Sequence, residues 1–224
     1  MITKLRKSPL FTHMSDGDIE RCLKCSGSEI VSYEKEETIF LMQDQPKKLF
    51  ILLEGSVTIC RDSIAGKRTI ITTINQAGDL FGEVFLFLNK NEYDNYAIAT
   101  NNAKVLQMPK EYLYHNCENN CGFHTLLISN MLSILAQKAY YLNQKLSIIS
   151  SHTLRQKISK ILLNNATEDG NVVLKMNREE LSDFLNVARP SLSRELMKMQ
   201  EDGLIRVDTK KIKILDFDNM QNNL

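Results

Sequence analysis

Residues 176–205 read MNREELSDFLNVARPSLSRELMKMQEDGLI, and this stretch decides the fold of the C-terminal part of the chain. Asn177, with Glu180 three residues later, forms a capping-box pattern that predicts the start of a helix. After a three-residue break a second helix follows, with Pro190 in its first turn and Gly203 at its end. The stretch therefore predicts two helices joined by a tight turn.

Short segments on both sides of this helix pair complete a domain. After the pair, LIRV and KIKIL bracket a turn at 208–210 and predict a β-hairpin. A loop through 169–171 precedes the pair. Before that loop, apolar residues at helical spacing predict one more amphipathic helix: Leu154, Ile158, Ile161 and Leu162. A helix pair followed by a hairpin is a winged helix-turn-helix, which commonly binds DNA.

The second helix of the pair has one apolar face, formed by Leu192, Leu196 and Met199. Arginine can bridge guanine through two hydrogen bonds, and small hydroxyl groups reach phosphates or base edges. We therefore expect base contacts from polar residues of the other face: Arg189, Ser193 and Arg194. Phosphate contacts are expected from neighbouring residues and the wing: Arg178, Ser191, Lys198, Lys210 and Lys211. The alternative interpretation is an ordinary solvated helix face.

Residues 29–109 have a different hydrophobic pattern. Short apolar runs rich in β-branched and aromatic residues recur there, each closed by turn residues. This spacing predicts a small antiparallel sandwich or barrel of about eight strands. Ahead of it, Ser15 followed by acidic residues predicts the start of a short helix.

A long helix is predicted between these two regions. Its apolar residues are separated alternately by four and three positions: Ile128, Leu132, Leu135, Ala139, Leu142, Leu146 and Ile149. Such a heptad seam is typical of a parallel dimeric coiled coil. One amphipathic helix packed on its own sheet is the other interpretation that this pattern allows.

The chain resembles the CRP/FNR family of bacterial transcription regulators. The resemblance rests on LFILLEGSVTI (49–59), on AGDLFGEVFLF (77–87) and, more specifically, on 176–205. It implies an α+β fold with an antiparallel β-roll that senses an effector (1–120), a dimerisation helix (121–149) and a winged helix-turn-helix (150–224). It further implies a homodimer that binds double-stranded DNA at pseudo-palindromic half-sites about 34 Å apart, and RNA polymerase as a partner. The lack of an apolar run long enough for a signal peptide or a membrane span predicts a cytoplasmic protein.

One departure from the family pattern concerns the effector. Cyclic-nucleotide members carry an arginine that holds the cyclic phosphate, and a small residue follows that arginine. When Ala97 is aligned with this small residue, Asn95 takes the position of the arginine. No Arg or Lys occurs from 94 to 102, and a neutral amide cannot replace a guanidinium on phosphate. Lys90, in a nearby loop, is the substitute that the sequence offers. We therefore expect an unknown small-molecule effector other than cAMP.

The resemblance places the effector pocket at six residues: Gly82, Glu83, Val84, Asn95, Tyr96 and Ala97. For Gly82 and Glu83 a purely structural role, a tight turn and a capping carboxylate, is the alternative. A second departure lies in the reading helix, where several family members use Glu at the position of Pro190 to contact a base. Proline offers no side-chain hydrogen bond, so the DNA site should differ from theirs.

The cysteines and histidines allow a further hypothesis. Cys117, Cys121 and His124 would share one helix face if the long helix began near 117, and a metal, haem or thiol switch there would make a redox sensor. Two packed thiols and a capping histidine are the alternative. Cys22 and Cys25 resemble half of a cluster site, but a cluster usually needs four ligands. We expect no metal.

Charge and composition narrow the function classes. The chain of 224 residues has a formal net charge of +1, with 28 Lys and Arg against 27 Asp and Glu. This argues against a protein that coats nucleic acid or membranes by bulk charge, and predicts a modest salt dependence of DNA binding. No long apolar run predicts a membrane span, and no catalytic pattern predicts an enzyme. A ligand-binding module that recruits protein instead of DNA is the remaining alternative.

Overall fold

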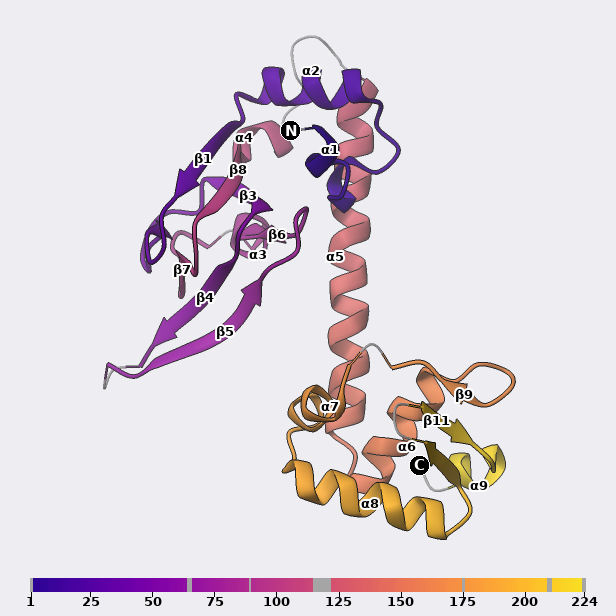
Figure 1. Ribbon diagram of the computed structural model, residues 1–224. Helices are drawn as coiled ribbons and strands as arrows, with labels where there is room; N and C mark the ends of the chain where they lie inside the picture. Colours follow the sequence, from indigo (N-terminus) through magenta and orange to yellow (C-terminus); the bar gives the residue numbers. More distant parts are fainter. Residues whose placement is uncertain are drawn as a thin grey trace. The chain divides into compact units, whose positions relative to one another are not determined.

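The computed structural model describes residues 2–63, 66–88, 90–114, 122–174, 176–208 and 211–222. The chain divides into two compact units, Met1–Ala136 and Gln137–Leu224. The long helix α5 (Gly122–Ile149) contributes residues to both units (Figure 1).

The N-terminal unit contains two four-stranded antiparallel sheets, ordered β1-β8-β3-β6 and β2-β7-β4-β5. The eight strands lie where the sequence predicts them: β1 (Glu29–Tyr33), β2 (Thr38–Phe40), β3 (Lys48–Glu54), β4 (Val57–Asp62), β5 (Arg68–Ile74), β6 (Leu80–Phe81), β7 (Tyr96–Ala99) and β8 (Ala103–Pro109). The predicted antiparallel β-domain is confirmed.

Strand β3 explains why its sequence is apolar without alternation. It lies between β8 and β6, and five successive side chains are buried. Because successive side chains of a strand point to opposite faces, Leu49 and Ile51 enter one core cluster, while Phe50 and Leu52 enter another. The first cluster also takes in the N-terminal helices and α5, and the second lies among the strands and α3.

Short helices accompany the sheets: α1 (Ile2–Leu5), the 3-10 turn η1 (Pro9–Phe11), α2 (Asp16–Ser26), α3 (Glu83–Phe87) and α4 (Lys110–Tyr114). Ser15 caps α2 as predicted, since its side chain accepts from the Asp18 N–H and the Asp18 carboxylate accepts from the Ser15 N–H. Gly27 ends α2 in the left-handed conformation (φ 62°), which glycine adopts without strain.

Helix α5 carries two different apolar stripes. The stripe that packs into the core of the N-terminal unit is Phe123, Leu127, Met131 and Ile134. The predicted heptad seam is another stripe, of which Leu132, Ala139, Leu142 and Leu146 are exposed and Ile128, Leu135 and Ile149 are partly buried. Every residue from 136 to 143 is exposed. Helix α5 therefore packs into the N-terminal unit mainly through the first stripe, and most residues of the heptad seam take no part in this packing.

The C-terminal unit contains α6 (Leu154–Asn164), β9 (Asn171–Val172), α7 (Arg178–Leu185), α8 (Arg189–Glu201), β10 (Ile205–Asp208), β11 (Lys211–Ile214) and α9 (Phe217–Asn222). The helix pair and the hairpin are as predicted. Strand β9 corrects the prediction that 169–171 is only loop, because Asn171 and Val172 pair with Lys213 and Ile212 and give the sheet order β10-β11-β9.

Candidate nucleic-acid interface and effector site

Side-chain caps fix the position of the helix pair. The Asn177 Oδ1 accepts from the N–H groups of Glu179 (2.9 Å) and Glu180 (3.0 Å), and the Glu180 Oε2 accepts from the Asn177 N–H at 2.7 Å. Asn186 ends α7 in the left-handed region (φ 54°), so the chain turns and α8 starts at Arg189. The predicted capping box is confirmed.

Helix α8 buries one face and exposes the other. Leu192, Leu196 and Met199 are at most 3% exposed, and they pack against residues of α6 and α7. The opposite face is exposed and carries Arg189, Pro190, Ser193, Arg194 and Lys198, while Ser191 is partly buried. In Figure 1, α8 runs along the outer edge of the C-terminal unit. The predicted base-contacting residues therefore share one accessible helix surface.

Arg155 of α6 holds α8 from its inner side, a role that the sequence did not reveal. Its guanidinium donates to the Glu195 Oε1 (2.6 Å) and to the Asp202 Oδ2 (2.6 Å), at the middle and the end of α8. The hydrogen bond to Glu195 is the main reason that the pKa of Arg155 is raised. Glu195 of α8 and its C-cap residue Asp202 are thereby engaged by Arg155.

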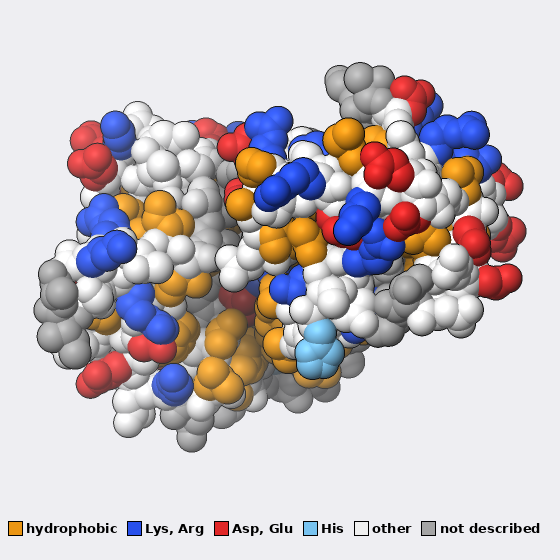
Figure 2. Space-filling view, turned by 90° about the horizontal axis from the view of Figure 1, so that it is seen from below, with side chains coloured by type: hydrophobic (Ala, Val, Ile, Leu, Met, Phe, Trp, Pro, Cys, Tyr) orange, Lys and Arg blue, Asp and Glu red, His pale blue; other side chains and the backbone are white. Residues whose placement is uncertain are grey.

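The exposed cations of α8 are available for a ligand. Among the described residues none forms an ion pair with Arg189, Arg194 or Lys198, and Arg194 reaches only the Ser191 hydroxyl, at 3.3 Å. Figure 2 shows Lys and Arg side chains scattered among hydrophobic, neutral and acidic ones, without a continuous basic field on that face. This distribution suits binding through a few placed contacts better than through bulk charge.

Arg178 occupies a different environment at the start of α7. It is partly buried, its Nη1 has no hydrogen-bond partner, and burial lowers its pKa. It lines a hollow of about 710 Å³ together with Arg189, Asn177 and the apolar Ile212. A guanidinium nitrogen without an acceptor is unfavourable, and an anion in the hollow would satisfy it.

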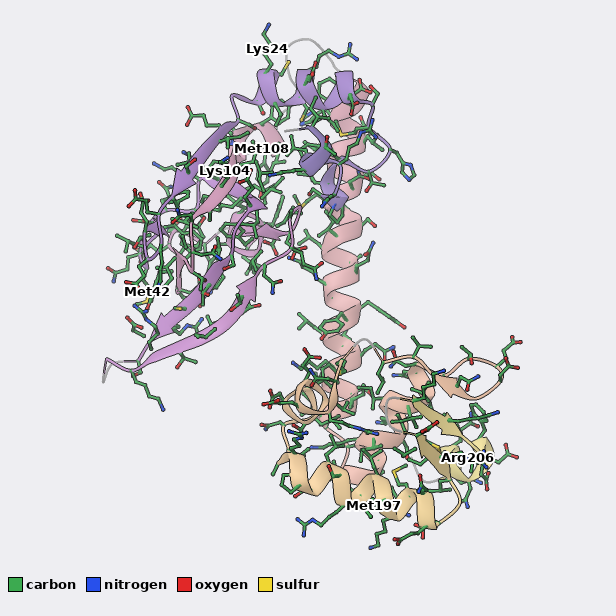
Figure 3. The ribbon with its side chains drawn as sticks, viewed as in Figure 1. Lys24, Met42, Lys104, Met108, Met197 and Arg206 are labelled. Atoms are coloured by element: carbon green, nitrogen blue, oxygen red, sulfur yellow. The ribbon has the colours of Figure 1, made fainter. Side chains whose placement is uncertain are left out.

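The hairpin adds cations, two of which face each other across the strands. Lys211 and Lys213 of β11 are exposed; Arg206 of β10 lies directly opposite Lys213, whereas Lys211 lies opposite Asp208. Like charges in this register repel, which an anion between them would relieve. Figure 3 labels Arg206 on this hairpin. Arg206 was not among the predicted contacts, because the predicted turn at 208–210 pairs it with Ile212, whereas the observed register places it opposite Lys213. Lys210 lies outside the described residues.

In the N-terminal unit, Gly82 and Glu83 open helix α3. Gly82 is left-handed (φ 77°), and a Cβ there would lie 2.8 Å from the Phe50 ring, so this glycine is required by the fold. Glu83 is only 3% exposed. The structural interpretation of Gly82 therefore holds, whether or not the turn also faces a ligand.

Two buried polar groups of the N-terminal unit have no hydrogen-bond partner, and one of them, Tyr93, lies next to this turn. Asn95 is 8% exposed and Tyr93 is 3% exposed, and neither the Asn95 Oδ1 nor the Tyr93 hydroxyl has a hydrogen-bond partner. Burial, with lesser contributions from Asp44 and Glu83, raises the pKa of Tyr93. A Cβ on Gly82 would lie 3.6 Å from that hydroxyl. Tyr93 is therefore a candidate site residue that no sequence pattern indicated.

The other predicted pocket residues differ in how deeply they are buried. Ala97 is fully buried on β7, and the Tyr96 hydroxyl is engaged by Arg68 (2.8 Å) and Asp62 (2.9 Å). Val84 is 48% exposed and so lies apart from the buried members of the set. The structure thus brings Gly82, Glu83 and Tyr93 together and leaves Val84 toward solvent.

No lysine or arginine among the described residues is buried in the N-terminal unit. Two exposed cations share the carboxylate of Asp94, the residue before Asn95: Arg61 at 2.8 Å and Lys90 at 3.9 Å. The Lys90 ammonium also lies over the Phe85 ring, 5.7 Å from its centre.

Of the predicted set Cys117, Cys121 and His124, the structure describes His124. His124 is 4% exposed on α5, and its Nε2 lies 2.6 Å from the carbonyl oxygen of Tyr112, which implies that this nitrogen donates. Cys117 and Cys121 lie outside the described residues. Cys22 and Cys60 are buried and Cys25 is exposed. Within the described ranges no group of three or more His, Cys, Asp or Glu side chains could hold a metal ion.

Comparisons with known proteins bear on both units. Residues 30–120 match the model of the cyclic nucleotide-binding domain, and residues 156–222 match the Crp-like helix-turn-helix domain. The cyclic AMP receptor protein of Thermus thermophilus is 21% identical over 94% of each chain. The cAMP-activated global transcriptional regulator Vfr of Pseudomonas aeruginosa is 25% identical, over 80% of this chain and 85% of Vfr. The global nitrogen regulator of Nostoc sp. is 20% identical over 83% of this chain and 84% of that protein.

Solved structures agree on the fold. The catabolite activator protein of Thermus thermophilus superposes with a TM-score of 0.53 at 20% identity, covering 96% of this chain and 97% of that one. DNR from Pseudomonas aeruginosa gives 0.51 at 20% identity, covering 98% and 96%. None of the described helices has the length and hydropathy needed to cross a bilayer. The chain belongs to the CRP/FNR family of DNA-binding transcription regulators.

Proposed function

We propose that this protein is a homodimer that binds a pseudo-palindromic operator under the control of an effector other than cAMP. The observation that carries the proposal is the exposed row of Arg189, Ser193 and Arg194 on a helix whose other face is buried and tied down by Arg155. In a helix-turn-helix the second helix lies in the major groove, with its N-terminal residues at the base edges. We assign base contacts to these three residues.

The phosphate contacts follow from the same placement. Arg178 has a guanidinium nitrogen without a partner, and Ser191, Lys198 and Lys211 flank the reading surface. We add Arg206 to this set, while Lys210 stays a prediction. Phosphate contacts position the protein but carry no sequence information. Arg178→Ala should therefore weaken binding to all sequences alike and reduce the slope of log Kd against log salt by about 1.

The dimer is proposed from the unused stripe of α5. Leu132, Leu142 and Leu146 are each more than 60% exposed, at heptad spacing, on a helix that packs into its own unit mainly through other residues. Exposed leucines in a heptad seam gain stability by pairing with a second helix. This supports the three-part division into 1–120, 121–149 and 150–224, with the middle part pairing two copies.

The effector proposal rests on two observations: no Lys or Arg among the described residues is buried in the N-terminal unit, and Asn95 stands at the position of the family's arginine. A cyclic phosphate would meet the buried Glu83 carboxylate at the α3 turn, while Arg61 and Lys90 are exposed and pair with Asp94. Burying a phosphate without a paired cation is strongly unfavourable. The relatives that are named for cAMP therefore do not determine the effector of this chain.

The test uses the full-length protein and an operator selected from random duplex DNA. Selection should enrich a two-fold symmetric sequence, and cAMP at millimolar concentration should change neither its Kd nor the heat of titration. Failure to enrich any sequence would refute operator binding; saturable cAMP binding would refute the effector proposal. Such a regulator would act in the cytoplasm, where the chromosome lies, with RNA polymerase as the partner that the family resemblance implies.

A further inference from the structure

Pro190 lies where a reading helix offers its side chains to the bases. It is exposed in the first turn of α8, and at 3.6 residues per turn it lies on the side roughly opposite the buried Leu192 and Met199. Arg194 follows one turn later on the same side, and Met197, 63% exposed, two turns later. Figure 3 labels Met197 on this helix. The outward line of α8 is thus apolar, cationic and apolar.

The chemistry of proline restricts what this position can recognise. Its ring has no donor or acceptor, and its backbone nitrogen carries no hydrogen. In the major groove the thymine C5 methyl group is the apolar feature of the base edges, whereas cytosine presents an amino donor and guanine and adenine present acceptors. A proline ring against any of those polar edges would remove water from them without replacing the lost hydrogen bond.

We infer that Pro190 reads a thymine methyl group, one in each half-site, next to the bases contacted by Arg189 and Arg194. The inference rests on the proposed role of α8 as the reading helix. It gives that helix a second mode of recognition, by apolar contact, between two side chains that recognise by hydrogen bonds.

The experiment replaces single thymines by deoxyuridine, which removes the methyl group and keeps every hydrogen-bonding atom. The full-length protein is titrated with the selected operator and with duplexes in which each thymine is replaced in turn. One thymine per half-site should show about a fourfold loss of affinity, the amount expected for one buried methyl group. A 5-methyl-deoxycytidine at that position should bind better than deoxycytidine.

Two variants link the effect to the residue. Pro190→Ser should bind the thymine and uracil duplexes equally well. Pro190→Glu should prefer cytosine at that position, because a carboxylate accepts from the cytosine amino group, and Glu in the first turn also suits the helix dipole. Met197→Ala is the matched control: it removes an exposed apolar side chain from the same side of α8 and should keep the fourfold ratio.

The outcomes separate the inference from the proposed function. If selection enriches an operator but no thymine shows methyl dependence, the inference is wrong while operator binding stands. The same conclusion follows if the dependence persists in Pro190→Ser, or if Met197→Ala removes it. If no operator is enriched at all, the proposed function fails first.

Discussion

The two units of this molecule treat their polar groups in opposite ways. On α8 the cations Arg189, Arg194 and Lys198 are exposed and unpaired among the described residues, where they cost the fold little. In the N-terminal unit, Tyr93 and Asn95 have buried polar atoms without a partner, which is unfavourable for the fold. The C-terminal unit thus presents free cations suited to an anionic ligand, whereas the buried Asn95 oxygen of the N-terminal unit would need a hydrogen-bond donor. Family membership therefore predicts the DNA-contacting residues of this chain better than it predicts the identity of its effector.

The largest expected effect on operator affinity comes from breaking the proposed dimer, because each copy would bring one α8 to one half-site. The double variant Leu142→Asp, Leu146→Asp places charges in the exposed seam and should leave each unit folded. Loss of the second half-site should weaken operator binding by about 10²- to 10⁴-fold. Sedimentation equilibrium and fluorescence anisotropy measure the two effects. Tyr141→Asp, an exposed residue on another side of α5, should stay dimeric; a dimeric double variant would contradict the seam.

The next effect tests the reading unit alone. Arg194→Ala should weaken operator binding by about 1–3 kcal/mol and relax specificity at one base pair, because an arginine bridge to guanine is lost. Titration against operators with each base pair varied measures both. Lys24→Ala, an exposed cation of α2 in the other unit, should change neither. Unchanged affinity in Arg194→Ala would mean that α8 is not the reading helix.

The third prediction compares two asparagines of the N-terminal unit. The Asn130 amide donates to the carbonyl oxygens of Leu10 (2.9 Å) and Thr12 (2.8 Å), so Asn130→Leu should reduce the free energy of unfolding by about 1–3 kcal/mol. Asn95→Leu removes a buried oxygen that has no partner and should leave the ligand-free protein as stable as before, or more stable by up to about 1 kcal/mol. Urea unfolding of this unit measures both. Equal losses in the two variants would show that Asn95 is satisfied within the protein.

The smallest effect concerns the surface of the same unit. Glu54 accepts from the Lys4 Nζ (2.5 Å) and the Lys104 Nζ (3.3 Å), and the bond from Lys4 is the main reason that its pKa is lowered. A carboxyl group with a lowered pKa stabilises the fold above its ordinary pKa of about 4.3, and this contribution is lost as the pH falls through the lowered value. The melting temperature should therefore fall less between neutral and acidic pH in Glu54→Gln than in the unchanged protein. Adding Lys4→Met should then change little further; an additive effect would mean that the pair does not interact.

The fold was predictable where a local pattern sufficed. Asn177 with Glu180 defines the start of α7 through bonds within one turn, and apolar runs between turn residues locate the eight strands. Strand β9 was missed because two residues carry no periodicity and it forms only by pairing with β11. The heptad pattern located the seam of α5 but not the second stripe, from Phe123 to Ile134, which follows the shape of the neighbouring core.

The candidate sites divide in the same way. Exposed positions on α8 follow from helical spacing, so Arg189, Ser193 and Arg194 could be selected from the sequence. Arg155 is 40 residues from Glu195 and 47 from Asp202, so no local pattern links them. Tyr93 lies in a loop that enters the interior only because its backbone bonds to Asp44 and Gln43 of another loop. Contacts of this kind depend on the whole fold and escape single-sequence reasoning.

With the proposed dimer, the bare stretch of α5 from 136 to 143 would make the helical order of the chain depend on its concentration. A lone helix of this length that buries no side chain is marginal in water, and its order comes from whatever covers it. In the proposed dimer, a second copy would cover this stretch and keep it helical. Below the Kd of that dimer we expect the stretch to lose helical order, so that the two units would reorient more independently. The rotational correlation times of the two units should therefore diverge upon dilution, even though neither unit unfolds.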